Sequence, residues 1–334
     1  MDRPGDLELP RPGDDTPSAE PAVIVFAADD GYCLPLAVAM TSAARNYRGP
    51  APLQIFVLDA GILPEHRDRL SALLARLGVA IRWVPVDLGS LRQLPVHDHI
   101  TTTTYARLLV PSHLPAAITK AIYLDCDILV EADVGRLWCE AMGDDEYILG
   151  VQGHGTKRLI ATSPLARIPE VAAGPDEPYF NAGVLVMNLR AMRRDDVPER
   201  AFAFCRRWLT VVRNADQDIL NAMSIRRWRP VAPTWNLFLA QGGGKYVFRY
   251  QPGSILHFTS SSKPWNPRSI RYPQSADTRR AFRQYRKYMW ESGWFSAPAS
   301  LRQRIDYQAW KFARFGQRAA QPLLRPFKSA PAAP

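Results

Sequence analysis

The 334-residue sequence has few cysteines and no long apolar run. Its four cysteines lack the paired spacing of a metal-binding motif and are too few for a disulfide scaffold, which indicates a reduced protein. No stretch approaches the roughly 20 apolar residues that a membrane-spanning helix needs. The first residues are acidic and proline-rich without an apolar core, so we expect no secretory signal. A cytoplasmic protein is therefore predicted.

The sequence also lacks internal repeats and a collagen-like period, which excludes repeat and fibrous architectures. At 47% hydrophobic and 22% charged residues, it is too apolar for a disordered chain. The composition predicts a globular protein with enough material for one large core or two modest ones.

The formal net charge of +10 is concentrated at one end of the chain. Residues 266–334 contain 14 Lys and Arg against 3 Asp and Glu, a balance of +11, whereas residues 1–265 sum to −1. This asymmetry indicates a basic arm on a neutral globule. It argues against a protein that coats nucleic acid with a uniformly basic surface.

Strand and helix patterns alternate along the first half of the chain. A continuous apolar run at 22–28 is typical of a strand buried on both faces, and 53–58, 79–84 and 121–124 are further predicted strands. Between them, residues 34–46 and 64–77 have helical periodicity. Later, 183–187 resembles a strand, and 197–212 and 216–223 resemble helices. This order predicts an α/β fold with a mixed, mostly parallel sheet flanked by helices.

Composition suggests three segments. Residues 1–21 are rich in proline and acidic side chains and are expected to form a disordered leader. Residues 22–265 form the predicted globular domain. Residues 266–334 form a basic C-terminal extension with a helical pattern from about residue 276.

Candidate functional side chains follow the predicted strands, where ligands of α/β sheets bind. Asp29, Asp30 and Tyr32 follow the first strand and could hydrogen-bond and stack on a base or ribose. A turn that caps the next helix explains the same residues.

Asp125 and Asp127 flank Cys126 directly after the apolar residues 121–124. Two carboxylates at a strand end can share a divalent cation, which needs oxygen ligands and can bridge a diphosphate. Burial of both charges without a cation is costly, so the context favours a metal site over two solvated aspartates.

His257 and Lys263 follow another apolar stretch. The imidazole can ligate the same metal and suits Mn²⁺ better than Mg²⁺, while the lysine can neutralise a phosphate. A core histidine followed by a surface loop is the alternative. Likewise, Asp216 has the position of a helix cap, Asn181 that of a turn residue, and Arg107 lies one turn into a predicted helix.

Together these segments resemble glycosyltransferase family 8. The motifs AADDGY, TTYARL, YLDCD, FNAGVLVMNL, ADQDILN and HFTSSSKPW occur in the family's order over residues 22–265. The resemblance implies a GT-A-type, Rossmann-like fold that binds nucleotide sugars. It also implies retaining transfer of galactose or glucose from a UDP-hexose to a glycan or lipid-linked acceptor, such as lipopolysaccharide core, with Mn²⁺ or Mg²⁺.

The same resemblance implies roles for individual residues. Asp125, Asp127 and His257 match the family's metal ligands. Residues that match donor-sugar or catalytic positions are Arg107, Asn181, Asp216 and Gln217. Residues that match nucleotide, phosphate or acceptor positions are Ala28, Asp29, Asp30, Tyr32, His99, Thr104, Cys126, Ser260 and Lys263.

Two positions depart from the family pattern. Gly31 stands where Asn is common, and Ser260 replaces the glycine of the H-x-x-G-x-x-K motif. We expect altered donor affinity rather than loss of function. These departures leave a catalytically silent UDP-sugar-binding protein as an alternative, and a nucleic-acid-binding protein using the basic tail ranks below it.

The C-terminal tail contains an amphipathic pattern. Leu301, Ile305, Ala309, Phe312 and Phe315 share one helical face, and basic residues flank it. This pattern favours an anionic membrane surface as a partner, and hence a peripheral location on the inner face of the cytoplasmic membrane. A helix that packs on the catalytic domain is the alternative.

Overall fold

A computed structural model describes residues 20–87, 89, 102–153, 159–239, 248–260, 263–266 and 275–294. Most of the predicted leader, His99 and the amphipathic segment 301–318 lie outside the described residues.

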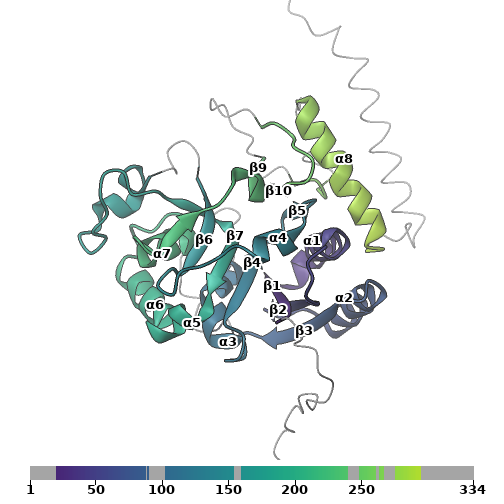
Figure 1. Cartoon of the computed structure of the whole chain (residues 1–334), viewed down its shortest axis with the longest axis horizontal. Helices are drawn as coiled ribbons and strands as arrows, with labels where there is room; N and C mark the ends of the chain where they lie inside the picture. The colour runs from purple at the N-terminus through teal and green to yellow at the C-terminus, as the bar shows by residue number, and fades with distance from the viewer. Residues whose placement is uncertain are drawn as a thin grey trace, which may run out of the picture.

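One seven-stranded sheet forms the centre of the molecule, in the order β3-β2-β1-β4-β7-β6-β8 (Figure 1). The pairs β1–β2, β2–β3, β1–β4 and β6–β8 are parallel, whereas β7 is antiparallel to β4 and β6. The predicted mixed, mostly parallel sheet is confirmed. The strands are β1 (Ala22–Ala28), β2 (Leu53–Asp59), β3 (Ala80–Pro85), β4 (Lys120–Leu124), β6 (Ile148–Gln152), β7 (Phe180–Asn188) and β8 (Trp228–Pro230).

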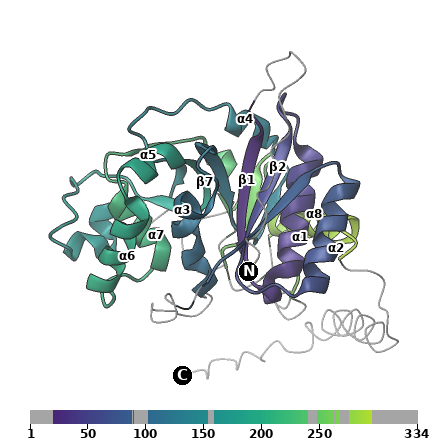
Figure 2. The ribbon, with the colours of Figure 1, turned by 90° about the horizontal axis from the view of Figure 1, so that it is seen from below.

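Helices cover both faces of this sheet, as Figure 2 shows. Alternate residues of β1 feed two separate cores because successive side chains of a strand point to opposite faces. Val23 and Val25 pack in the core between the sheet and helices α5, α6 and α7. Ile24 and Phe26 pack in the core between the sheet and helices α1 and α2. The α-helices are α1 (Cys33–Asn46), α2 (Pro64–Arg76), α3 (Val110–His113), α4 (Val134–Trp138), α5 (Leu189–Arg194), α6 (Val197–Arg207), α7 (Ala215–Met223) and α8 (Ala276–Glu291).

A second, three-stranded sheet lies beside the first and joins distant parts of the chain. It contains β5 (Ile128–Val130), β9 (Leu237–Phe238) and β10 (Ile255–His257), in the order β5-β10-β9. Since β10 is antiparallel to β5 with His257 opposite Ile128, the ring of His257 comes next to Asp127. Short 3₁₀ helices are η1 (Asp30–Tyr32), η3 (Thr102–Leu109), η5 (Ile160–Thr162), η6 (Pro164–Arg167) and η7 (Pro233–Trp235).

The helix predicted over 197–212 is shorter in the structure and ends at Arg207. Trp208 leaves the helical conformation (φ −116°), and its indole N–H donates to Glu170 at 3.0 Å. Trp208 thus bonds to a residue 38 positions away in the sequence, and the periodicity of residues 197–212 does not show that contact.

The described part of the basic extension packs against the body of the protein. Phe282, Tyr285 and Met289 of α8 are buried in a third core with Phe258, beside α1. The opposite side of α8 exposes Arg279, Arg283, Lys287 and Trp290, the last at 51%. The boundary at residue 265 remains a prediction. No helix among the described residues is long and apolar enough to cross a bilayer.

Candidate functional site

A cavity of about 270 Å³ opens beyond the carboxyl ends of β1 and β4. This is where ligands bind in open α/β sheets. The predicted site residues that line it are Ala28, Asp29, Tyr32, Thr104, Arg107, Asp125, Cys126, Asp127, Asn181, Asp216, Gln217, His257 and Lys263. Asp30 and Ser260 are not among the lining residues, and His99 lies outside the described part of the chain.

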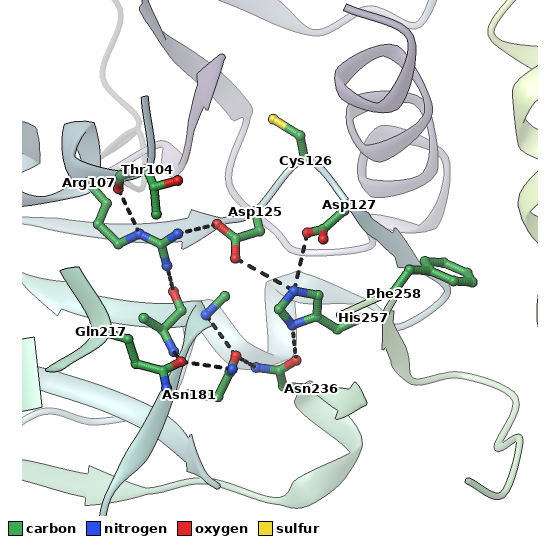
Figure 3. A network of polar contacts seen from close by, with 12 residues as sticks. Thr104, Arg107, Asp125, Cys126, Asp127, Asn181, Gln217, Asn236, His257 and Phe258 are labelled. Carbon is green, nitrogen blue, oxygen red and sulfur yellow. Dashed lines mark hydrogen bonds and ion pairs between the residues drawn. The ribbon is translucent and has the colours of Figure 1, made fainter. Parts of the chain in front are cut away.

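Two carboxylates and one imidazole converge at the centre of the cavity (Figure 3). The Nε2 atom of His257 lies 3.6 Å from Oδ2 of Asp125 and 3.2 Å from Oδ1 of Asp127. The triplet that contains the aspartates forms the turn between β4 and β5. Cys126 points away from the imidazole, with its Sγ 3.3 Å from the Ala27 carbonyl oxygen.

Gly183 allows the imidazole to approach strand β7. A Cβ atom at this position would lie 2.2 Å from Cε1 of His257 and 2.8 Å from Oδ2 of Asp125. Such distances are far shorter than van der Waals contact, so only glycine fits here without movement of the cluster. The close packing of His257 and Asp125 therefore explains why the segment FNAG ends in a glycine.

Neighbouring groups act differently on the two aspartates. Burial raises the pKa of Asp127, but His257 and Lys263 outweigh burial and hold that pKa below its ordinary value. For Asp125, burial has the largest effect and raises the pKa, although Arg107 opposes it. The two aspartates share His257, but Arg107 contacts only Asp125 and Lys263 contacts only Asp127.

Arg107 links this cluster to Asp216. Its guanidinium donates to Oδ1 of Asp125 at 2.8 Å and to the carbonyl oxygen of Ala182. Its Nε lies 2.6 Å from Oδ2 of Asp216, but the Nε–H points toward the Thr104 carbonyl oxygen, so the contact with Asp216 is an ion pair without hydrogen-bond alignment. Burial lowers the pKa of Arg107, and the two carboxylates more than reverse this effect.

Asp216 is buried at the start of α7. Burial raises the pKa of its carboxyl to about 7, although Arg107 opposes the shift. A carboxylate that lines a cavity and lies against a guanidinium can accept a hydrogen bond from a ligand hydroxyl.

The amides of Asn181 and Gln217 are bonded to each other and to the backbone. Oε1 of Gln217 accepts from Nδ2 of Asn181 at 2.9 Å and from the Ala182 N–H at 3.1 Å. Because both lone pairs of this oxygen have donors, it has no free lone pair for attack on a substrate. Gln217 therefore positions its neighbours.

On the opposite wall, the carboxylates of Asp29 and Asp30, which follow β1, contact different groups. The Thr103 hydroxyl donates to Oδ2 of Asp29 at 2.9 Å and holds that carboxylate at the cavity. Asp30 instead accepts from the Leu63 N–H at 3.0 Å and contacts Nδ1 of His66 at 2.6 Å. The adjacent carboxylates predicted to bind a nucleotide thus face different surroundings.

Lys263 and Tyr32 line the side of the cavity near Trp265. The Lys263 ammonium lies 2.6 Å from Oδ2 of Asp127 and donates to the Phe258 carbonyl oxygen. Trp265 packs edge-on to Tyr32 and also against Tyr285 of α8. The lysine predicted to bind phosphate therefore lies beside the predicted metal ligands.

Several residues in or beside the cavity were not singled out from the sequence. Thr103, Tyr123 and Asn214 line the cavity, and Asn236 contacts His257 from outside its wall. Thr103 belongs to a run of four threonines, so the sequence offers no reason to choose it. Asn236 follows a 3₁₀ helix in an irregular segment, where no periodic pattern marks a buried amide.

The cluster of Asp125, Asp127 and His257 fits a divalent cation. One ligand atom from each of the three residues lies within 4.8 Å of the others. Two carboxylate oxygens and one imidazole nitrogen suit Mn²⁺ and tolerate Mg²⁺. The close approach over Gly183 brings the three side chains around one small volume.

The chain is similar to known proteins over most of its length. The profile of Glycosyl transferase family 8 matches residues 23–268. The chain is 26% identical over 260 residues to general stress protein A of Bacillus subtilis, covering 73% of this chain and 87% of that protein. It is 21% identical over 255 residues to lipopolysaccharide 1,2-glucosyltransferase of Escherichia coli, covering 73% of each.

The fold matches that of a solved galactosyltransferase. LgtC, in complex with donor and acceptor sugar analogues, superposes with a TM-score of 0.65 and 26% sequence identity. The match covers 80% of this chain and 95% of that one. The region matched by the family profile, residues 23–268, contains all the residues that line the cavity.

Proposed function

Because the chain belongs to glycosyltransferase family 8, we propose that it transfers galactose or glucose from a UDP-sugar with retention of configuration. The proposed cofactor is Mn²⁺, with Mg²⁺ as the alternative. The proposed acceptor is a glycan or lipid-linked saccharide such as lipopolysaccharide core. One observation carries the proposal: the Asp125–Asp127–His257 cluster lies in the same cavity as Arg107, Asp216 and Lys263.

The metal-binding residues would be Asp125, Asp127 and His257. When bound there, the cation supplies Lewis-acid stabilisation of charge on a leaving diphosphate. The ammonium of Lys263 supplies a second positive charge at the same place. The side chains of Asp29 and Tyr32, which line the same cavity, would hold the nucleotide.

Arg107, Asn181, Asp216 and Gln217 would surround the donor sugar. In our proposal, Asp216 accepts hydrogen bonds from sugar hydroxyls, since its contact with Arg107 favours this role over that of covalent nucleophile. The acceptor hydroxyl would attack from the face that the diphosphate leaves, and the departing phosphate would take its proton. This sequence of events gives retention without a dedicated side-chain base.

A screen of UDP-sugars tests the proposed activity. UDP-galactose or UDP-glucose should release UDP in the presence of Mn²⁺, and chelation of the metal should abolish the release. Other UDP-sugars should react more slowly, because the buried polar groups around the sugar would be left unpaired. Binding of UDP with no turnover of any UDP-hexose would instead identify a silent binding protein.

We also propose that the C-terminal extension binds anionic membranes. The exposed side of α8 is basic, and residues 295–334 add seven Lys and Arg against one Asp. Each Lys or Arg that lies close to an anionic membrane surface contributes about 1 kcal/mol of attraction.

Sedimentation with vesicles tests this location. The full-length protein should pellet with vesicles that contain phosphatidylglycerol, and less with neutral phosphatidylcholine vesicles or at high salt. A form that ends at Trp294, which retains α8, should pellet less. Equal pelleting of the two forms would contradict a role for residues 295–334.

A further inference from the structure

A chain of hydrogen bonds connects a buried carboxylate at the start of α7 with the ring of His257. Its members in order are Asp218, Tyr179, Gln217, Asn181, Asn236 and His257. Each hydrogen bond has one donor and one acceptor. Groups that can only donate or only accept, such as a backbone N–H or a carboxylate, determine which atom donates at every step.

Asp218 fixes the direction at one end. Its Oδ2 accepts the backbone N–H groups of Arg213 and Asn214, each at 2.8 Å. Since a carboxylate only accepts, the Tyr179 hydroxyl donates to Oδ1 at 2.6 Å. The phenolic oxygen, 3.0 Å from Nε2 of Gln217, is then free to accept from that amide.

Backbone N–H groups fix the direction again in the middle. The Ala182 N–H requires that the atom of Gln217 opposite it be the amide oxygen, which also accepts from Nδ2 of Asn181. Likewise, the Gly183 N–H requires an oxygen on Asn181, at 2.9 Å. That oxygen also receives Nδ2 of Asn236 at 2.8 Å.

The direction of the last link then follows. With its amide nitrogen on Asn181, Asn236 presents its oxygen to Nδ1 of His257 at 2.9 Å. The side chain of Asn236 is fully buried, so water does not compete for this contact. An amide oxygen needs a donor, so Nδ1 carries a proton, and Nε2 is the ring nitrogen that faces Asp125 and Asp127 (Figure 3).

We propose that Asn236 is a positioning residue for the cation site, because it holds His257 in the tautomer whose Nε2 lone pair faces the two aspartates. The proposal rests on the proposed cation site, but the tautomer itself does not depend on the reaction. Outer hydrogen-bond partners commonly fix the tautomer and orientation of a metal-binding histidine. Here the partner is a neutral amide. The same series of hydrogen bonds includes Asn181 and Gln217, which we propose lie around the donor sugar.

The position of the ring proton is the direct test. Proteins with ¹⁵N-labelled histidine are compared without metal, at a pH at which the ring is neutral, and the His257 signal is assigned by its loss in His257→Gln. The wild-type ring should carry its proton on Nδ1. In Asn236→Leu the proton should move to Nε2, whereas Asn236→Asp retains an acceptor and should keep it on Nδ1.

Metal affinity is the second readout. Binding of Mn²⁺ alone, measured from the electron paramagnetic resonance signal of the free ion, should weaken by about 10–100-fold in Asn236→Leu. Tyr179→Phe should bind Mn²⁺ nearly as well as the wild type, because the Ala182 and Gly183 N–H groups still fix both amides. Asn46→Leu, which removes an amide in contact with Tyr288 of α8, controls for general destabilisation.

The outcomes separate this proposal from the proposed function. A wild-type neutral ring with its proton on Nε2 overturns the positioning role even if the enzyme transfers hexose and even if Asn236→Leu does not fold. Unchanged Mn²⁺ affinity in a folded Asn236→Leu protein overturns it as well. Absence of hexose transfer, with the proton on Nδ1 and the expected loss of affinity, overturns only the proposed function.

Discussion

The Asp125→Asn variant should lose at least about 100-fold in hexose transfer, the usual effect of removing one group that stabilises charge in a transition state. The substitution preserves shape but removes the charge that faces both His257 and Arg107. Arg107 retains Asp216 as a partner, so we expect the fold to persist.

The measurement combines turnover with Mn²⁺ affinity and a thermal unfolding curve. Asp145→Asn is the matched control, because this carboxylate is 76% exposed and forms only surface ion pairs, which contribute little to stability. Turnover and Mn²⁺ affinity equal to those of the wild type in Asp125→Asn would contradict the assignment of the metal site.

The second large effect is expected from the addition of one methyl group at Gly183. In Gly183→Ala the new Cβ would meet Cε1 of His257 at 2.2 Å and Nδ1 at 2.7 Å. The buried ring must move, and displacement of a catalytic group by about 1 Å can cost about 100-fold in rate. The variant should fold with a stability loss of about 1–3 kcal/mol, as for other overpacked sites.

Gly150→Ala is the matched control on the neighbouring strand β6. There the new Cβ would lie 3.4 Å from Cδ2 of Leu185 and 3.5 Å from Cβ of Phe180, close to ordinary contact distances. We expect Gly150→Ala to keep wild-type turnover and Mn²⁺ affinity. If Gly183→Ala also kept wild-type turnover and Mn²⁺ affinity, the prediction that a methyl group at this position displaces His257 would be wrong.

Much of the fold followed from local pattern. The continuous apolar run of β1 predicted a strand buried on both faces, and its alternate residues do enter two different cores. Pro64 marks the first residue of α2, where the missing N–H of proline has no cost. The carboxylates on either side of Cys126 predicted a cation site at a strand end, because repulsion between them needs compensation. Each inference uses residues that are neighbours in the sequence.

Other features were decided by the tertiary structure. The carboxylate of Asp30 contacts His66 instead of the cavity, although Asp29 beside it lines the wall. The direction of the amides depends on backbone N–H groups of β7, which the antiparallel pairing with β4 brings to the site. Sequence alone does not show these contacts, since they join residues tens of positions apart.

The sequence by itself determined the kind of fold, the motif order of the family and the side chains that can hold a cation. Only the tertiary structure decided that Gly183 must lack a side chain and that Asn236 holds His257. The physical reason is that periodicity and motif spacing compare residues close together along the chain, whereas hydrogen-bond direction and steric fit arise only when β7, η7 and β10 pack together.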